Sequence, residues 1–268
     1  MRRNAGILAG LAAALLLTGC FDVEQTLVLK KDLSGTAGFR MTVNMEPMVL
    51  MMTRMQHQMS GKEGEPTAAE IEQARKDFLA QKKTEGEPSP AEQKAEVEKS
   101  LPPGVKLLDG GVEDKDFKIL AHFNFGFDDV NKLKQIKLAK KTAKEGETGE
   151  TPPPEQPGSK NPFDTPFGDL RIDRQGDTLL LTTKPTNPME KQGEEMGGGE
   201  MDPAMKKQME EAFQGLRVAW KIETPFQVLE SNATRREGKT LIWEYTLDTF
   251  EKMTPEQRAE GIRAKFKM

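Results

Sequence analysis

The chain has 268 residues, and 39 Lys and Arg stand against 43 Asp and Glu, which gives a formal net charge of −4 at pH 7. This acidic balance argues against a nucleic-acid-binding protein, since such proteins usually carry a dense basic excess that neutralises phosphates. One Cys and two His are too few for a Cys/His zinc site, and a single Cys excludes an intramolecular disulfide.

The first 19 residues have the form of a secretory signal peptide. Arg2 and Arg3 precede an apolar run over residues 5–17, which is too short to span a membrane. The run ends at Leu17-Thr18-Gly19-Cys20, which matches the lipobox of bacterial lipoproteins at every position. The sequence therefore predicts that Cys20 is acylated on sulfur and becomes the mature N-terminus. Phe21, rather than Asp, follows Cys20, which favours the outer membrane in a host that has two membranes.

The first segment after Cys20 has the alternating pattern of the two strands of a β-hairpin. Residues 23–30 and 37–43 alternate between apolar and polar side chains, as expected of half-buried strands. Turn-forming residues lie between them, in Lys31-Asp32-Leu33-Ser34-Gly35. We expect two antiparallel strands joined by this turn.

Over residues 46–100 the apolar residues no longer alternate as in a strand but recur at helical spacing, so we predict a helical insertion there. Thr67-Ala68-Ala69-Glu70 and Ser89-Pro90-Ala91-Glu92 are capping boxes, the second with Pro at the first helical position. The apolar stripes that follow them are thin, so these helices should pack weakly.

The middle of the chain mixes regular segments with two low-order stretches. Strands resume near Val105, and residues 117–127 alternate strictly, which predicts a strand followed by a short helix over residues 128–138. Residues 140–162 contain five prolines and no large apolar residue, so we expect a disordered linker. A hairpin over residues 169–184 precedes a second stretch of this kind, residues 185–202, and then a helix to about Gln214.

The C-terminal third is the most regular part of the sequence. Residues 216–222 and 241–247 alternate so that Trp220 and Trp243 point inward. Thr254-Pro255-Glu256-Gln257 then caps a short helix that leads to a closing strand over residues 262–268. One-sided alternation in every strand predicts an antiparallel sheet with one face covered by helices, which is an α+β fold. We expect a single domain over residues 20–268.

Catalytic motifs are missing from the sequence. No Ser lies in a Gly-x-Ser-x-Gly elbow, and Cys20 is consumed by lipidation. His57 falls in a Met-rich helix and His122 on the polar face of a strand, where a solvent-facing role is the simplest interpretation. Asn232-Ala233-Thr234 matches a glycosylation sequon, although a turn between strands explains it equally well. We predict no catalytic residues, no cofactor and no metal ion.

Methionines are the unusual feature. They recur every three or four residues over residues 45–59, so that a helix there would carry a continuous thioether stripe, and at spacing four over residues 201–209. Three interpretations stay open: packing against the sheet, an adaptable groove for acyl chains or a partner helix, and Cu(I) binding by thioethers. The groove interpretation assigns ligand binding to Met48, Met52, Met55 and Met59.

A set of motifs at the two ends of the mature chain resembles the LppM-like family of bacterial lipoproteins. These motifs are the lipobox Cys20, the turn Asp32 to Gly35, and the segments Thr224-Pro225, Val228, Ser231-Asn232-Ala233 and Gly238-Lys239-Thr240-Leu241-Ile242-Trp243. The resemblance implies a sheet-and-helix domain associated with lipid binding. It supplies no catalytic residues.

The sequence as a whole predicts a non-enzymatic envelope lipoprotein. We expect a lipid anchor on the extracytoplasmic side of the cell membrane or the outer membrane, with a domain that binds a lipid, another apolar ligand or an envelope partner protein. The alternative is a structural spacer or assembly factor. Deletion of residues 140–162 separates the two, because a linker-dependent spacer loses function and a ligand-binding domain keeps it.

Overall fold

The computed structural model describes residues 21–62, 64–84, 90–138, 165–184, 207 and 210–268. The expected signal peptide with Cys20 and the expected linkers at residues 140–162 and 185–202 lie outside the described residues, as does most of the helix expected before Gln214.

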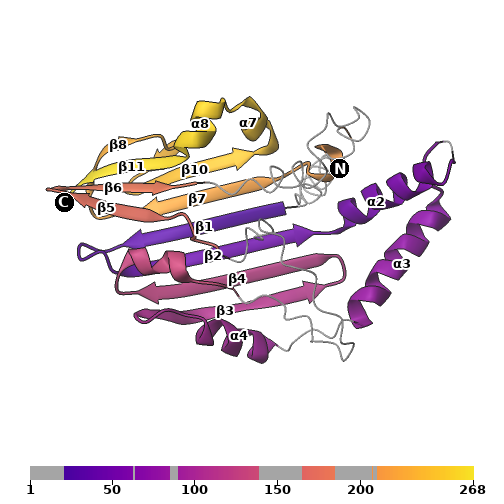
Figure 1. The fold of residues 1–268 in the computed structure, drawn as a ribbon, viewed down its shortest axis with the longest axis horizontal. Coiled ribbons are helices and arrows are strands. Elements are labelled where there is room, and N and C mark those ends of the chain that lie inside the picture. Colours follow the sequence, from indigo (N-terminus) through magenta and orange to yellow (C-terminus); the bar gives the residue numbers. More distant parts are fainter. Residues whose placement is uncertain (1–20, 63, 85–89, 139–164, 185–206, 208–209) are drawn as a thin grey trace, which may run out of the picture.

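The larger of two β-sheets has seven strands in the order β3-β4-β2-β1-β7-β10-β9 (Figure 1). The expected first hairpin is confirmed, since β1 pairs with β2 in antiparallel register from Phe21 opposite Val43 to Leu29 opposite Gly35. The strands are β1 (Phe21–Leu29), β2 (Gly35–Asn44), β3 (Val105–Lys115), β4 (Lys118–Phe127), β7 (Arg217–Glu223), β9 (Arg235–Glu237) and β10 (Thr240–Thr246).

One pair in this sheet is parallel. β1 pairs with β2 on one side and with β7 on the other, where Gln25 lies opposite Trp220 in parallel register. The remaining pairs of the sheet are antiparallel. The alternating pattern of each strand fixes which side chains face inward, but it carries no information on the partner, so this pairing was not predicted.

The smaller sheet has four strands in the order β5-β6-β11-β8. The expected hairpin before residue 184 is confirmed, and its turn contains Gly176 with a φ of 64°, a conformation that favours glycine. The strands are β5 (Arg171–Gln175), β6 (Thr178–Thr183), β8 (Gln227–Ser231) and β11 (Ile262–Lys267). After β8 the chain crosses to the larger sheet, where β9 lies at the edge.

The two sheets share one hydrophobic core. Phe167, in the segment before β5, makes edge contacts with Phe125 of β4 and Trp220 of β7. Trp220 and Trp243 are 1% and 0% exposed, as their strand positions predict. The α+β class is confirmed, while the covered face of the larger sheet meets the smaller sheet as well as helices. Side chains of both sheets and of helices belong to this core, among them Leu27, Ile222, Leu181, Phe266, Val97, Leu133 and Phe250.

The predicted helical insertion is present as α2 (Glu46–Met59), α3 (Ala68–Thr84) and α4 (Pro90–Lys99). The α2–α3 hairpin extends beyond the end of the larger sheet at which β1 starts and β2 ends (Figure 1). Few contacts attach this hairpin to the sheet, as expected: the Phe78 ring stacks on Phe117 with ring centroids 5.6 Å apart, and Lys82 pairs with Asp114. The expectation of weak packing is wrong for α4, because its Val97 is 4% exposed and belongs to the hydrophobic core.

The remaining helices are short. The helix expected over residues 128–138 is a 3-10 helix, η1 (Val130–Gln135), which Asp129 caps by accepting a hydrogen bond from the Asn131 amide. In the last part of the described chain, α7 (Leu247–Lys252) and α8 (Pro255–Glu260) both begin at a capping box. The sequence indicated α8, which ends at Gly261 with a φ of 63°.

Candidate functional surface

Helix α2 has one face covered by α3. Val49 and Thr53 are buried, and the His57 side chain, one turn further, is 8% exposed and lies 3.3 Å from the Glu70 carboxylate of α3. Arg75 of α3 forms an ion pair with Glu46 at the start of α2. The helix therefore packs on α3 through a stripe that does not contain the predicted methionines.

The predicted methionines form another face of the same helix, here named the methionine face: Met48, Met52, Met55 and Met59. Their spacing of four, three and four residues brings them within about 60° of one another around the helix axis. Met52 is 62% exposed, Met59 is 86% exposed and Met55 is half-buried. Exposed apolar side chains on one helix face are typical of an interaction surface. Ligand binding by these four residues stays a prediction.

The base of the methionine face is attached to the larger sheet. Met48 and Met51 line a small cavity of about 30 Å³ together with Phe21 at the start of β1. The other lining residues are Val43, Asn44, Ala212 and Phe213. A cavity of this size holds about one water molecule, so it is no groove for an acyl chain.

The predicted lipidation site lies immediately before the first strand. Cys20 itself is outside the described residues, but Phe21, the next residue, is already in β1 and is 7% exposed. One peptide bond therefore separates the predicted anchor from the folded domain, at the same end of the sheet as the base of α2.

Glu70 connects the two helices of the hairpin. Its carboxylate accepts hydrogen bonds from Lys62 and from the backbone amide of Thr67, and these bonds lower the pKa of Glu70 from 4.5 to about 2. The Glu70 amide in turn reaches the Thr67 hydroxyl, which completes the capping box predicted for α3. His57 therefore lies beside a carboxylate that closes a helix hairpin.

The second histidine is a strand residue far from this hairpin in sequence. His122 lies on the outer face of β4, and its Nε2 atom is 3.6 Å from the Asp109 carboxylate on β3. Its side chain is 35% exposed, which agrees with the expected solvent-facing position.

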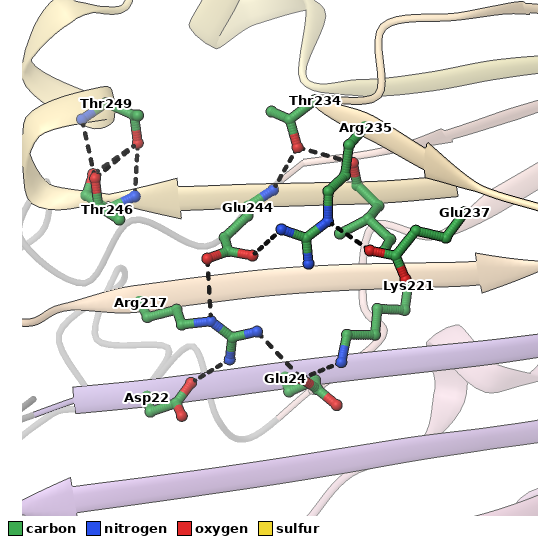
Figure 2. A network of polar contacts seen from close by, with 11 residues as sticks. Asp22, Glu24, Arg217, Lys221, Thr234, Arg235, Glu237, Glu244, Thr246 and Thr249 are labelled. Atoms are coloured by element: carbon green, nitrogen blue, oxygen red, sulfur yellow. Dashed lines mark hydrogen bonds and ion pairs between the residues drawn. The ribbon is translucent and has the colours of Figure 1, made fainter. Parts of the chain in front are cut away.

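A network of ion pairs covers the outer face of the larger sheet across β1, β7, β10 and β9 (Figure 2). Arg217 is at its centre and lies 2.8 Å from Asp22, 3.3 Å from Glu24 and 3.4 Å from Glu244. Lys221 also contacts Glu24, at 2.7 Å. Sequence reasoning missed this network, because alternation shows that these residues share a face but not that their strands are neighbours.

The contacts of the network shift the pKa values of Arg217 and Glu24. Burial alone lowers the pKa of Arg217, but the hydrogen bonds to Asp22 and Glu24 and the charges of Asp22 and Glu244 raise it overall. Burial alone raises the pKa of Glu24, whereas the hydrogen bonds from Lys221 and Arg217 lower it overall. These groups satisfy one another across four strands, so we interpret the network as a stabilising feature of the sheet rather than a binding site.

A broad depression of about 690 Å³ lies between the end of β10 and the segment that precedes β7. Its walls are strongly charged and include Lys207, Glu210, Glu211, Arg217, Asp248 and Glu251. Such a lining does not suit an apolar ligand.

Two absences hold for the described part of the chain, one of a metal site and one of a membrane-spanning helix. There, no three His, Cys, Asp or Glu side chains come together in a way that would hold a metal ion. Likewise, none of the described helices is both long and apolar enough to cross a bilayer.

Comparison with known proteins gives little further information. No protein-family model matches the sequence, and no curated protein matches it. Among solved structures, the chain is weakly similar to the folded domain of the Mycobacterium tuberculosis LppM protein, with a TM-score of 0.40 and 11% sequence identity. The alignment covers 93% of this chain and 90% of that chain. The resemblance expected from the sequence is thus matched by a weak likeness of structure and by no sequence family.

Proposed function

We propose that this chain is a non-enzymatic lipoprotein of the bacterial envelope that is anchored through Cys20 and binds an apolar ligand or a partner protein through the methionine face. The observation that carries the proposal is the exposure of Met52 and Met59 on a helix whose base shares a cavity with Phe21. A binding surface and a lipid anchor would then lie at the same end of the domain.

The positions of the two histidines support the non-enzymatic part of the proposal. His57 lies beside Glu70 in the helix hairpin, and His122 lies beside Asp109 on the outer face of the larger sheet. Acid-base or nucleophilic catalysis needs several such groups around one reacting centre, and these two lie on separate elements.

The lipobox supports the proposed location. Acylation of Cys20 would hold the protein stably on a bilayer, because each buried methylene contributes about 0.8 kcal/mol and a lipoprotein carries two or three acyl chains. The signal peptide would place the domain on the extracytoplasmic side, at the cell membrane or the outer membrane.

Metabolic labelling tests the anchor. Cells that express the full chain are fed an alkyne analogue of palmitate, and the label on the wild type is compared with that on Cys20→Ser. We expect the label and the membrane association to be lost in the variant. Retention of the label in Cys20→Ser would contradict the proposed anchor, because the sequence holds no second Cys to accept it.

Native mass spectrometry tests the binding function. The full chain is released from membranes into lipid nanodiscs, and bound lipid or protein is recorded for the wild type, for Met59→Asp and for the neighbouring control Gln58→Asp. We expect a bound lipid or protein species to be lost with Met59→Asp and kept with Gln58→Asp. The same bound species in all three proteins would count against the methionine face as the binding surface.

A further inference from the structure

The predicted anchor leaves the folded domain almost no freedom to move away from a membrane. Adjacent Cα atoms are about 3.8 Å apart, so an acylated Cys20 lies within that distance of Phe21. Phe21 is fixed in the sheet, because it pairs with Val43 and is 7% exposed. The end of the larger sheet at which β1 starts must therefore be at the membrane surface.

The anchor lies on the methionine side of α2. Phe21 lines the same small cavity as Met48 and Met51, whereas His57, about 180° around the helix from Met48, contacts α3. A membrane that holds Cys20 is therefore on the side of α2 toward which the methionine face is directed, and α3 lies on the far side.

The exposed part of the methionine face extends along the helix. Met52 and Met59 are seven residues apart, which corresponds to about 10 Å along the axis, and Met55 lies between them. Met side chains are flexible and polarizable, so they adapt to the irregular boundary between head groups and acyl chains.

The charge of the hairpin also suits a membrane surface. Residues 46–84 contain six acidic and six basic residues, a net charge of zero, whereas the mature chain as a whole has 37 basic and 43 acidic residues, a net charge of −6. The hairpin is therefore free of the net repulsion that the rest of the chain would meet at an anionic bilayer. Without a basic face, α2 would bind a membrane weakly by itself, and the tether at Cys20 supplies the local concentration that makes weak contact sufficient.

The geometry points to a phospholipid bilayer as the occupant of the methionine face, with α2 lying along the membrane surface and Met52, Met55 and Met59 at the level of the head groups and upper acyl chains. This inference rests on the proposed anchor at Cys20. It fixes the orientation of the domain, since the turn between β5 and β6 and the end of β11 lie at the opposite end of the molecule from α2 and then project away from the membrane (Figure 1).

Site-specific fluorescence tests this orientation. Cys20 is the single Cys of the chain, and acylation blocks its sulfur, so an introduced Cys is the one reactive thiol. Met52→Cys and Met59→Cys are labelled with an environment-sensitive nitrobenzoxadiazole dye in the full lipidated chain. The protein is reconstituted into vesicles of phosphatidylethanolamine with a minor share of phosphatidylglycerol, with and without nitroxide-labelled lipid.

Two exposed positions serve as controls. Ala80→Cys lies on α3, about 180° around that helix from Ile71 on its half-buried stripe, and Asp177→Cys lies in the turn between β5 and β6. We expect the dyes at residues 52 and 59 to emit at shorter wavelength and to be quenched several-fold more by the nitroxide lipid than the dyes at residues 80 and 177.

The outcomes distinguish the inference from the proposed function. If the protein floats with the vesicles and residues 52 and 59 are quenched no more than the controls, the bilayer is not the occupant, although the anchor stands. Dyes at residues 52 and 59 that are shielded by a co-purifying protein in place of lipid would overturn the inference in the same way. Protein that fails to float would overturn the anchor and the inference together.

Discussion

The indole Nε1 of Trp243 donates a hydrogen bond of 2.8 Å to the side-chain oxygen of Asn232. Trp243 is fully buried in the larger sheet, while Asn232 follows the last residue of β8 in the smaller one. The same Asn232 oxygen accepts a bond from the Arg263 amide of β11, and its Nδ2 donates to the Gly261 carbonyl. One side chain therefore joins both sheets at the point where the chain crosses between them.

Replacement of Asn232 by Ala should be strongly destabilising. The change leaves the buried Trp243 N–H without its acceptor and removes two further hydrogen bonds, and an unsatisfied buried polar group costs about 1–3 kcal/mol. We expect the free energy of unfolding to fall by about 2–3 kcal/mol, measured by urea denaturation at neutral pH.

Asn232→Asp is the matched control. It keeps the acceptor for Trp243 and Arg263 and loses the donor to Gly261, so its cost should be smaller than that of the Ala variant. Equal destabilisation by Asp and Ala would show that the bond to Gly261, and not the link to Trp243, holds the crossing in place.

The crossing also shows what local pattern can and cannot reveal. The sequence left two interpretations for Asn232-Ala233-Thr234, a sequon or a turn between strands, and the structure has the segment between β8 and β9. Thr234 donates to the Ile242 carbonyl, so both polar residues of the motif are used in the fold. Which strands they join depends on contacts distant in sequence, and a motif of three residues does not encode these.

Features that depend on neighbouring residues were predicted well. Alternation placed Trp220 and Trp243 inward, and the Thr67 and Thr254 motifs predicted the starts of α3 and α8. The parallel pairing of β1 with β7 and the ion pairs of Arg217 with Asp22 and Glu24 were missed, because both depend on register between segments 193 to 195 residues apart. For the candidate surface, spacing predicted that the methionines share a face, but only burial shows that Met52 and Met59 are exposed.

Glu24 should make the stability of the protein sensitive to acid. Its pKa in the folded chain is lowered from 4.5, so its stabilising effect is present above about pH 4.5 and is lost as the pH falls through the lowered value. Glu24→Gln removes this titration. We therefore expect the difference in the free energy of unfolding between neutral pH and about pH 3 to be smaller in the variant than in the wild type, measured by urea denaturation at each pH.

Lys221→Met tests independently whether the contact with Lys221 is what lowers the pKa of Glu24. It removes the partner that lies 2.7 Å from Glu24 and should raise the pKa of that carboxyl toward 4.5, so acid sensitivity should again decrease. An unchanged pH dependence in both variants would mean that other carboxyl groups carry the effect. At neutral pH each change should cost roughly 0.2–1 kcal/mol, the usual range for partly exposed ion pairs.

Glu70 should hold the start of α3 in place over a wide pH range. Its capping bonds are strongest when the carboxylate is ionised, and its pKa of about 2 keeps it in that form until the medium is strongly acidic. In Glu70→Ala, we expect faster amide hydrogen exchange in the first turn of α3 than in the wild type, detected by mass spectrometry of peptides from residues 64–84. Glu70→Gln can still complete a capping box, so its exchange should stay close to that of the wild type. Equally fast exchange in the Gln and Ala variants would show that the negative charge beside Lys62, and not the capping box, holds the first turn of α3 in place.

Substitutions on the methionine face separate the three interpretations of the thioether stripe. Met52→Leu and Met55→Leu keep volume and apolar character, so they should change the free energy of unfolding by less than about 1.5 kcal/mol and leave membrane contact intact. A Cu(I) site would instead lose affinity in these variants, because Leu lacks the sulfur donor.

Met59 is 86% exposed, so Met59→Asp should fold like the wild type. We expect it nevertheless to speed transfer of the lipidated protein from donor to acceptor vesicles, while Gln58→Asp, with the same charge change one residue earlier, transfers at the wild-type rate. Unfolding of Met59→Asp would show that the face is part of the core, and identical transfer rates for the two Asp variants would show that it makes no contact with the bilayer.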